Sequence, residues 1–322
     1  MKKLIKIAYI IFSLLFITIC CDKIYPGHAV TYTFTGGRFG DNLGMYMLGK
    51  WVAYKHGMEL LYKPFHYSDH LVLHNIEKRF DNEMQKYPTS IQLKQGTKID
   101  PDEKKSILYV INAYDGSFFE DYPVNWEDQG FKAELKKMIT PQQAFPKIAF
   151  PQGYVTVAVH VRKGGYEGDE KDLQDRIPRK FLPEEYYIDQ IAQLYQRCKG
   201  VPLYIFIFTD DDNPMAIKHR FEQIFSSGYN IKFDCRMTLN RHNINVLEDY
   251  FAFFQFDCFI HGLSNFAVCA SWMGDHCIDI APLEFKRENG KTIVSKLDII
   301  ERLHLAPKIL TDHLSSQNMP KH

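Results

Sequence analysis

One stretch of this chain constrains its fold more than any other. Residues 154–161 form an apolar run in which valine recurs at every second position, a pattern typical of a buried β-strand. Arg162 and Lys163 follow the run, and the glycine pair 164–165 then favours a turn of the backbone. Ligands bind at the carboxyl ends of strands in an open α/β sheet, and the planar fork of an arginine suits phosphate oxygens. We interpret this stretch as an anion-binding strand end; a surface Arg–Lys pair before a loop is the alternative.

The organisation of the whole chain follows from how this pattern repeats. Strand-like and helix-like segments alternate on both sides of a proline-punctuated linker at 141–151, and 322 residues suit two domains. We predict an α/β fold of two doubly wound domains of the Rossmann type that face a cleft. The expected domains are 25–150 and 151–310, with 277–280 as the strand that closes the second sheet and 311–322 as a loose tail.

Residues 1–24 have a different character. Lysines precede an apolar run from Ile7 to Ile19, which has the length of a signal peptide and is short for a spanning helix. The positive charges place the body of the protein on the far side of a membrane. Cys20 and Cys21 favour a lipoprotein site, although Ile19 is bulky for one. A cleaved signal, a lipid anchor and an uncleaved anchor stay open, and they predict a secretory lumen in a eukaryote or the cell envelope in a bacterium.

Composition excludes two classes of function. Lysine plus arginine (39) equals aspartate plus glutamate (39), so no overall field attracts nucleic acid. The cysteines after Cys21 are odd in number and form no C-x-x-C pair, so neither a disulfide framework nor a zinc site is indicated. Any anion must therefore be bound by local features of the chain.

Three further turns carry polar groups at the predicted strand ends. Residues 36–42 form a Gly-rich turn that leads into a helix ending near Gly57; its N–H groups can approach an anion, although a turn without ligand is equally consistent. The acidic run 209–212 is either a D-x-D metal site or the start of a helix capped by Asn213, and we favour the cap. The third turn, 262–266, places a serine and an asparagine where they can cap a helix or bind a phosphate.

Together these stretches, over residues 30–280, resemble the GDP-fucose-dependent fucosyltransferases of the GT-B type. This group includes the bacterial α-1,2-fucosyltransferases of glycosyltransferase family 11 and the protein O-fucosyltransferases. Residues 160–166 (HVRKGGY) are similar to the family's H-V-R-R-G-D-Y, with Lys163 and Gly165 as departures. Residues 37–42 resemble G-R-F-G-N-Q, residues 208–211 resemble F-S-D-D, and Ser264-Asn265-Phe266 resembles Ser-Ser-Phe.

The resemblance implies inverting transfer of fucose from GDP-fucose or a related GDP-sugar to a glycan or protein hydroxyl. It implies an acceptor-side N-terminal domain, a C-terminal domain that binds the nucleotide sugar, and no required metal or other cofactor. Arg162 would stabilise the charge on the leaving phosphate and His160 would orient the site. The implied donor-binding residues are Gly37, Arg38, Phe39, Gly40, Asn42, Asp210, Asp211, Ser264, Asn265 and Phe266. Two alternatives stay open: an exported two-lobed solute-binding lipoprotein and a metal-dependent D-x-D transferase.

Overall fold

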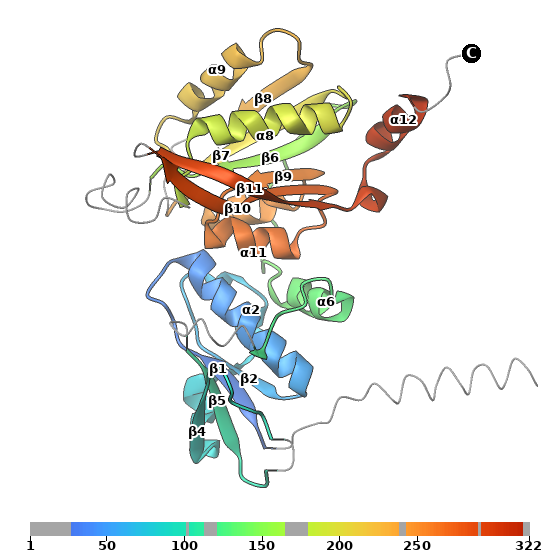
Figure 1. Cartoon of the computed structure of the whole chain (residues 1–322). Helices are drawn as coiled ribbons and strands as arrows, with labels where there is room; N and C mark the ends of the chain where they lie inside the picture. The colour runs from blue at the N-terminus through green and yellow to red at the C-terminus, as the bar shows by residue number, and fades with distance from the viewer. Residues whose placement is uncertain are drawn as a thin grey trace, which may run out of the picture. The chain divides into compact units, whose positions relative to one another are not determined.

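The structure is a computed structural model, and the chain divides in it into two compact units, 1–142 and 143–322, each with its own sheet and helices (Figure 1). The expected signal or anchor at 1–24 lies outside the described residues. Within the described ranges, no helix is long and apolar enough to cross a membrane. The structure describes residues 27–100, 103–112, 121–164, 180–237, 243–288 and 291–317.

The first unit is built on a five-stranded parallel sheet of order β3-β2-β1-β5-β4. Strand β4 lies within residues 82–105. The polar composition and weak periodicity of that segment predict only loops and a short helix. Strand β4 is an edge strand in which Leu93 alone is fully buried, so its sequence lacks the apolar run of an inner strand. The strands are β1 (Ala29–Tyr32), β2 (Glu59–Tyr62), β3 (Lys78–Arg79), β4 (Thr89–Leu93) and β5 (Ile107–Ile111).

Helix α2 (Phe39–His56) is the main helix of the first unit and ends where the sequence predicts, at Gly57, which adopts φ 61°. Most of α2 is buried, including Lys50, whose ammonium lies 2.9 Å from Glu77 and 2.8 Å from Glu134. These two carboxylates compensate the buried charge. The remaining helical segments are η1 (Ser68–His70), α3 (Leu73–Ile76), α4 (Phe80–Glu83), η2 (Met84–Lys86) and α6 (Gln129–Met138).

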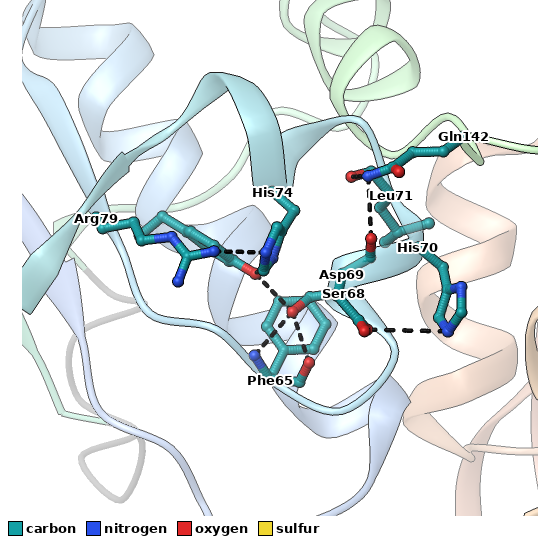
Figure 2. A network of polar contacts seen from close by, with 9 residues as sticks. Phe65, Ser68, Asp69, His70, Leu71, His74, Arg79 and Gln142 are labelled. Carbon is teal, nitrogen blue, oxygen red and sulfur yellow. Dashed lines mark hydrogen bonds and ion pairs between the residues drawn. The ribbon is translucent and has the colours of Figure 1, made fainter.

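A network of polar contacts shapes the segment after β2 and fastens the end of the first unit to it (Figure 2). The Ser68 hydroxyl accepts a hydrogen bond from the Phe65 N–H at 2.9 Å, and His74 contacts Arg79. The Gln142 amide donates to the carbonyls of Asp69 (3.0 Å) and Leu71 (2.9 Å). Gln142 therefore belongs structurally to the first unit.

The linker expected at 141–151 packs instead against the second unit from Gln143 onward. The Ile148 N–H donates to the Gln255 side chain at 3.0 Å, and Phe145 stacks on Phe251 with ring centroids 5.7 Å apart. Phe150 makes an edge contact with Phe256 at 5.0 Å. Because these aromatic contacts hold the segment, the chain divides at 142/143, earlier than the expected 150/151.

The second unit contains a six-stranded sheet of order β11-β10-β9-β6-β7-β8, parallel except for the β10–β11 pair. The strand expected to close the sheet at 277–280 is only the start of β10, which continues into an antiparallel hairpin with β11. The strands of this hairpin contain charged, half-exposed residues, so the sequence shows no continuous apolar run there. The strands are β6 (Val155–Val161), β7 (Leu203–Thr209), β8 (Ile231–Cys235), β9 (Cys258–His261), β10 (Ile278–Glu288) and β11 (Lys291–Glu301).

The two faces of this sheet are packed with different side chains. Alternate valines and isoleucines of β6 and β7 pack against α8 (Glu184–Arg197) and α9 (Pro214–Ile224). On the other face, aromatic rings of the strands meet those of α10 (Val246–Phe253) and α11 (Asn265–Met273).

Residues 311–317 of the loose tail expected at 311–322 are helical, and 318–322 lie outside the described residues. Residues Lys308–Gln317 form α12, preceded by the short η4 (Leu303–Leu305). Leu310 of α12 is 1% exposed and joins the aliphatic core of the second unit. Ile309 and Leu314 also pack against this core, but three apolar residues in a ten-residue segment give only a short helical pattern in the sequence.

Candidate functional site

The second sheet reverses its strand order at β6. From β6 the chain proceeds to β7 and β8 on one side, and then returns to place β9 and β10 on the other side. Adjacent loops at the carboxyl ends of β6 and β9 therefore diverge, which is the position where open α/β sheets bind ligands. Arg162 follows β6 and Ser264 follows β9. Their side chains meet: the Arg162 Nη1 donates to the Ser264 Oγ at 3.1 Å.

Arg162 is held as a largely buried cation. Its side chain and backbone are 9% exposed, and its guanidinium carbon lies 5.3 Å from the centroid of the Phe181 ring. Ser264 is 2% exposed and occupies the N-cap position of α11, but its hydroxyl makes no capping bond. The cap that the sequence favoured is thus replaced by the contact with Arg162. The turns after β6 and β9 therefore meet at this contact, and Asn265 and Phe266 begin α11 beside it.

The backbone turn after β6 is fastened by a carboxylate from the neighbouring strand. Asp210 Oδ1 accepts hydrogen bonds from the N–H groups of Lys163 (2.8 Å) and Gly164 (3.0 Å). Backbone N–H groups of a Gly-rich turn can bind a phosphate, but these two already donate to Asp210. The remaining residues of the HVRKGGY motif, Gly165 and Tyr166, lie outside the described residues.

The rest of the acidic run starts helix α9. Asp211 accepts from the Asn213 N–H at 2.7 Å, and Asn213 in turn accepts from the Ala216 N–H at 3.2 Å, with Pro214 at the first helical position. The predicted Asn–Pro helix start is therefore correct, whereas neither Asp210 nor Asp211 caps the helix. In the part of the chain that the structure describes, no group of three or more His, Cys, Asp or Glu side chains is arranged to hold a metal ion.

His160 lies buried two positions before Arg162. Its ring is 5.7 Å from those of Phe253 and Phe266. Burial, assisted by the charge of Arg162 and by His261, lowers the pKa of His160 to about 3. The imidazole is thus neutral at physiological pH and cannot serve there as a proton donor in the imidazolium form.

A second buried pair supports His160 from the next strand. His261, its neighbour in the β6–β9 register, contacts Asp279 of β10 at 3.1 Å and the Gly262 carbonyl at 2.8 Å. Burial opposes ionisation of Asp279, but His261, His276 and Ser271 together outweigh it and hold the pKa of the carboxyl below its ordinary value. Sequence analysis did not single out this pair, because only the pairing of β9 with β10 brings the two residues together.

The remaining predicted site residues form the turn between β1 and α2 in the first unit. Asp41 Oδ2 accepts from the Arg38 N–H at 3.1 Å, and the Asn42 side chain donates to the Gly37 carbonyl at 3.2 Å. Gly37 is required here, since a Cβ atom would lie 2.5 Å from the Asp41 carboxyl carbon. Phe39 and Gly40 are buried in the first turn of α2. This turn also lies at a reversal of strand order, between β1 and β5.

Lys163 points to a different partner than Arg162 does. Its ammonium lies 2.7 Å from Glu184 at the start of α8. Glu184 also accepts two hydrogen bonds from Arg220, at 2.9 and 2.6 Å, and these bonds, with help from Lys163, hold the pKa of the Glu184 carboxyl below its usual range. Glu184 was not among the predicted site residues, although an acid after Pro183 at a helix start is a detectable signal.

A cavity of about 830 Å³ extends from this strand end, between α8 and β11. Arg162 and Lys163 line its inner end, and residues 292–297 of β11 line one wall. Its volume falls within the usual range of small-molecule sites.

Comparisons with known proteins identify the fold. No protein-family model and no curated protein sequence matches the chain. An arginine-to-lysine mutant of FUT1 from Arabidopsis thaliana, solved in complex with GDP, matches with a TM-score of 0.51 at 13% identity, over 87% of this chain and 74% of that one. POFUT1 matches in complex with GDP-fucose (TM-score 0.39, 12% identity, 80% and 96% of the chains) and in its apo form (0.43, 10%, 78% and 96%). The chain thus has the two-unit α/β fold of the GT-B type that FUT1 shows, as the motifs led us to expect.

Proposed function

We propose that this protein is a glycosyltransferase that transfers fucose, with inversion, from GDP-fucose to a hydroxyl of a glycan or protein. The contact between Arg162 and Ser264 at the strand reversal of the second sheet carries the proposal, because it sets a buried cation and a hydroxyl at the expected ligand edge. The similarity of the motifs to fucosyltransferases and the shared fold with a GDP-bound FUT1 structure support the choice of donor.

The geometry suits stabilisation of a leaving diphosphate. Negative charge grows on the β-phosphate as the bond to the sugar breaks, and a preorganised guanidinium offsets that charge without reorganising in the transition state. Ser264 and the Phe181 ring hold the Arg162 side chain, while Asp210 holds the backbone that follows it. The neutral His160 ring packs against Phe253 and Phe266 and would act as a positioning residue. Arg162 supplies the positive charge in this scheme, so the proposed reaction requires no metal or other cofactor.

Donor and acceptor are assigned to different units in the proposal. The second unit would bind the nucleotide sugar, and the first unit would bind the acceptor. The apolar segment before residue 25 would place the enzyme in a secretory lumen or cell envelope, attached to a membrane or exported.

Nucleotide-dependent thermal stabilisation tests the proposal. We expect GDP to raise the melting temperature of the full chain at millimolar concentration, whereas UDP and ADP give much smaller shifts. Arg162→Ala should abolish the GDP shift and lower the transfer rate by about two to three orders of magnitude. Arg197→Ala, which removes a half-exposed arginine paired with Glu301 at 2.8 Å, is the matched control and should keep the shift.

Other outcomes separate the remaining hypotheses. A chain that ignores GDP but binds a free sugar would be a solute-binding protein, and the transferase proposal would be withdrawn. Activity that a chelator removes would point to the metal-dependent alternative. Asp210 and Asp211 argue against that alternative, since one oxygen of each already accepts hydrogen bonds from backbone N–H groups.

A further inference from the structure

The α8 wall of the cavity carries a stripe of three polar, solvent-exposed side chains. Glu185, Asp189 and Gln193 recur at every fourth position, so they share one face of the helix. Within the described ranges, none of these three side chains makes a hydrogen bond or ion pair with the rest of the chain. A polar stripe is ordinarily a solvated helix face, but this one lines a cavity.

Gln190, on the same wall, is the observation that points to a ligand. The residue is 5% exposed, and its Oε1 atom is buried with no hydrogen-bond partner in the described part of the chain. Buried polar atoms of native proteins are nearly always satisfied, by protein or by another molecule. A ligand hydroxyl that enters the cavity beside Gln190 would supply the missing donor.

The opposite wall is irregular where it meets the cavity. The β10–β11 pairing runs from Pro282 opposite Leu297 to Phe285 opposite Val294, with register shifts on both sides of Glu284. Such bulges redirect side chains and often occur beside binding sites. Ser295 lies in this irregular stretch and lines the cavity.

We infer that the cavity between α8 and β11 binds a neutral carbohydrate chain. Two carboxylates on one wall repel an anion, while carboxylate, amide and hydroxyl groups together can accept from and donate to successive sugar hydroxyls. The two lysines that line the cavity already have acidic partners: Lys163 is paired with Glu184 and Lys296 with Glu284. If the proposed function holds, this cavity adds a glycan-binding site to the unit that binds the nucleotide sugar, because Arg162 lines the cavity as well.

Saturation-transfer NMR with lactose, cellobiose and chitobiose tests the inference on the full chain. We expect at least one of these neutral disaccharides to bind, and the Asp189→Ala, Gln193→Ala double variant to weaken binding about tenfold or more. Ser295→Trp should block binding by filling the cavity. Gln196→Ala, an exposed residue on α8 that does not line the cavity, should bind as the wild type does. Melting curves of each variant show whether it folds.

The same samples, titrated with GDP, separate this inference from the proposed function. Disaccharide binding without GDP stabilisation would support the carbohydrate site and contradict the proposed transferase function. Two outcomes would overturn the carbohydrate site alone. The first is GDP stabilisation with no disaccharide binding at about 10 mM disaccharide. The second is disaccharide binding that neither the double variant nor Ser295→Trp weakens. Preferential binding of glucuronic acid over the neutral sugars would also overturn it.

Discussion

The two units place a turn at the same point of their sheets and close it in different ways. In each unit the turn follows the strand at which the strand order reverses, β1 in the first and β6 in the second. In the first turn the carboxylate that accepts from the backbone is Asp41, three residues further along the same helix. In the second turn it is Asp210, at the end of the next strand. The first closure is local, whereas the second depends on the β6–β7 pairing.

The difference shows where anion affinity can come from. In both turns a carboxylate of the chain occupies backbone N–H groups that a Gly-rich turn otherwise offers to a phosphate. In the proposed function, binding of an anion at the second turn therefore falls to the side chain of Arg162. The strand beneath that turn differs as well: β6 carries neutral, buried His160, while in β1 the Thr31 hydroxyl donates to the Leu61 carbonyl at 2.8 Å.

The largest expected difference between the units appears in acid. Burial is the main cause that lowers the pKa of His160 from 6.5 to about 3, and burial also lowers the pKa of His276 in the same unit. The unfolded chain therefore binds these protons at higher pH than the folded chain does, and stability falls as the pH drops from about 6.5 towards 3. The loss is about 1.4 kcal/mol per pH unit for a histidine that stays neutral in the fold.

The carboxyl of Asp249 has the opposite effect on the pH dependence of stability, and over a narrower pH range. Burial raises its pKa to about 6 against the attraction of Arg236, so its contribution is fully present below 3.8 and lost as the pH rises through 6. The pKa of Asp249 moves from 3.8 to about 6, a smaller change than that of His160 from 6.5 to about 3, so Asp249 offsets only part of the loss and a net loss in acid is expected.

Tryptophan fluorescence can follow the two units separately. Trp272→Phe leaves Trp51 and Trp126 as reporters of the first unit, and the reverse double substitution leaves Trp272 alone. We expect the Trp272 signal to change at higher pH than the other two. Coincident acid transitions in both variants would show that the buried histidines do not set the stability of the second unit.

Removal of each closing carboxylate tests the comparison directly. Asp210→Ala leaves two half-buried N–H groups without their charged acceptor, and we expect a loss of about 2 kcal/mol in the free energy of unfolding. Asp41→Ala removes a helix cap and should cost about 1 kcal/mol. Urea denaturation measures both, with Asp210→Asn as the control that keeps one acceptor oxygen. Only Asp210→Ala should also reduce stabilisation by GDP; equal effects of the two variants on GDP binding would contradict the division of roles.

Sequence analysis correctly predicted those features that are determined by a few consecutive residues. The C-terminal glycine of α2 at Gly57, the Asn213–Pro214 start of α9 and the buried strand that precedes Arg162 all follow from local preferences. The motifs likewise located the two strand-end turns. Each of these features depends on residues that are close in the sequence, so the single sequence was sufficient to predict it.

Features that depend on strand pairing were beyond the sequence. Asp210 reaches the turn after β6 because the register sets Val161 opposite Thr209, and nothing near Asp210 in the sequence indicates that partner. The His261–Asp279 pair and the wall of the cavity at Ser295 arise in the same way, from the β9–β10 and β10–β11 pairings.

Lys163 provides the smallest and sharpest test of the comparison, because it follows Arg162 directly yet has a different partner. Its side chain is 28% exposed, and its partner Glu184 keeps two hydrogen bonds from Arg220 when Lys163 is removed. We therefore expect Lys163→Met to cost about 0.5 kcal/mol in stability and to retain GDP stabilisation, measured by the same thermal shift as for Arg162→Ala. If Lys163→Met lost the GDP shift as completely as Arg162→Ala does, Lys163 would have to leave Glu184 for the nucleotide. The anion site would then consist of two cations, and Arg162 would not bind the phosphate alone.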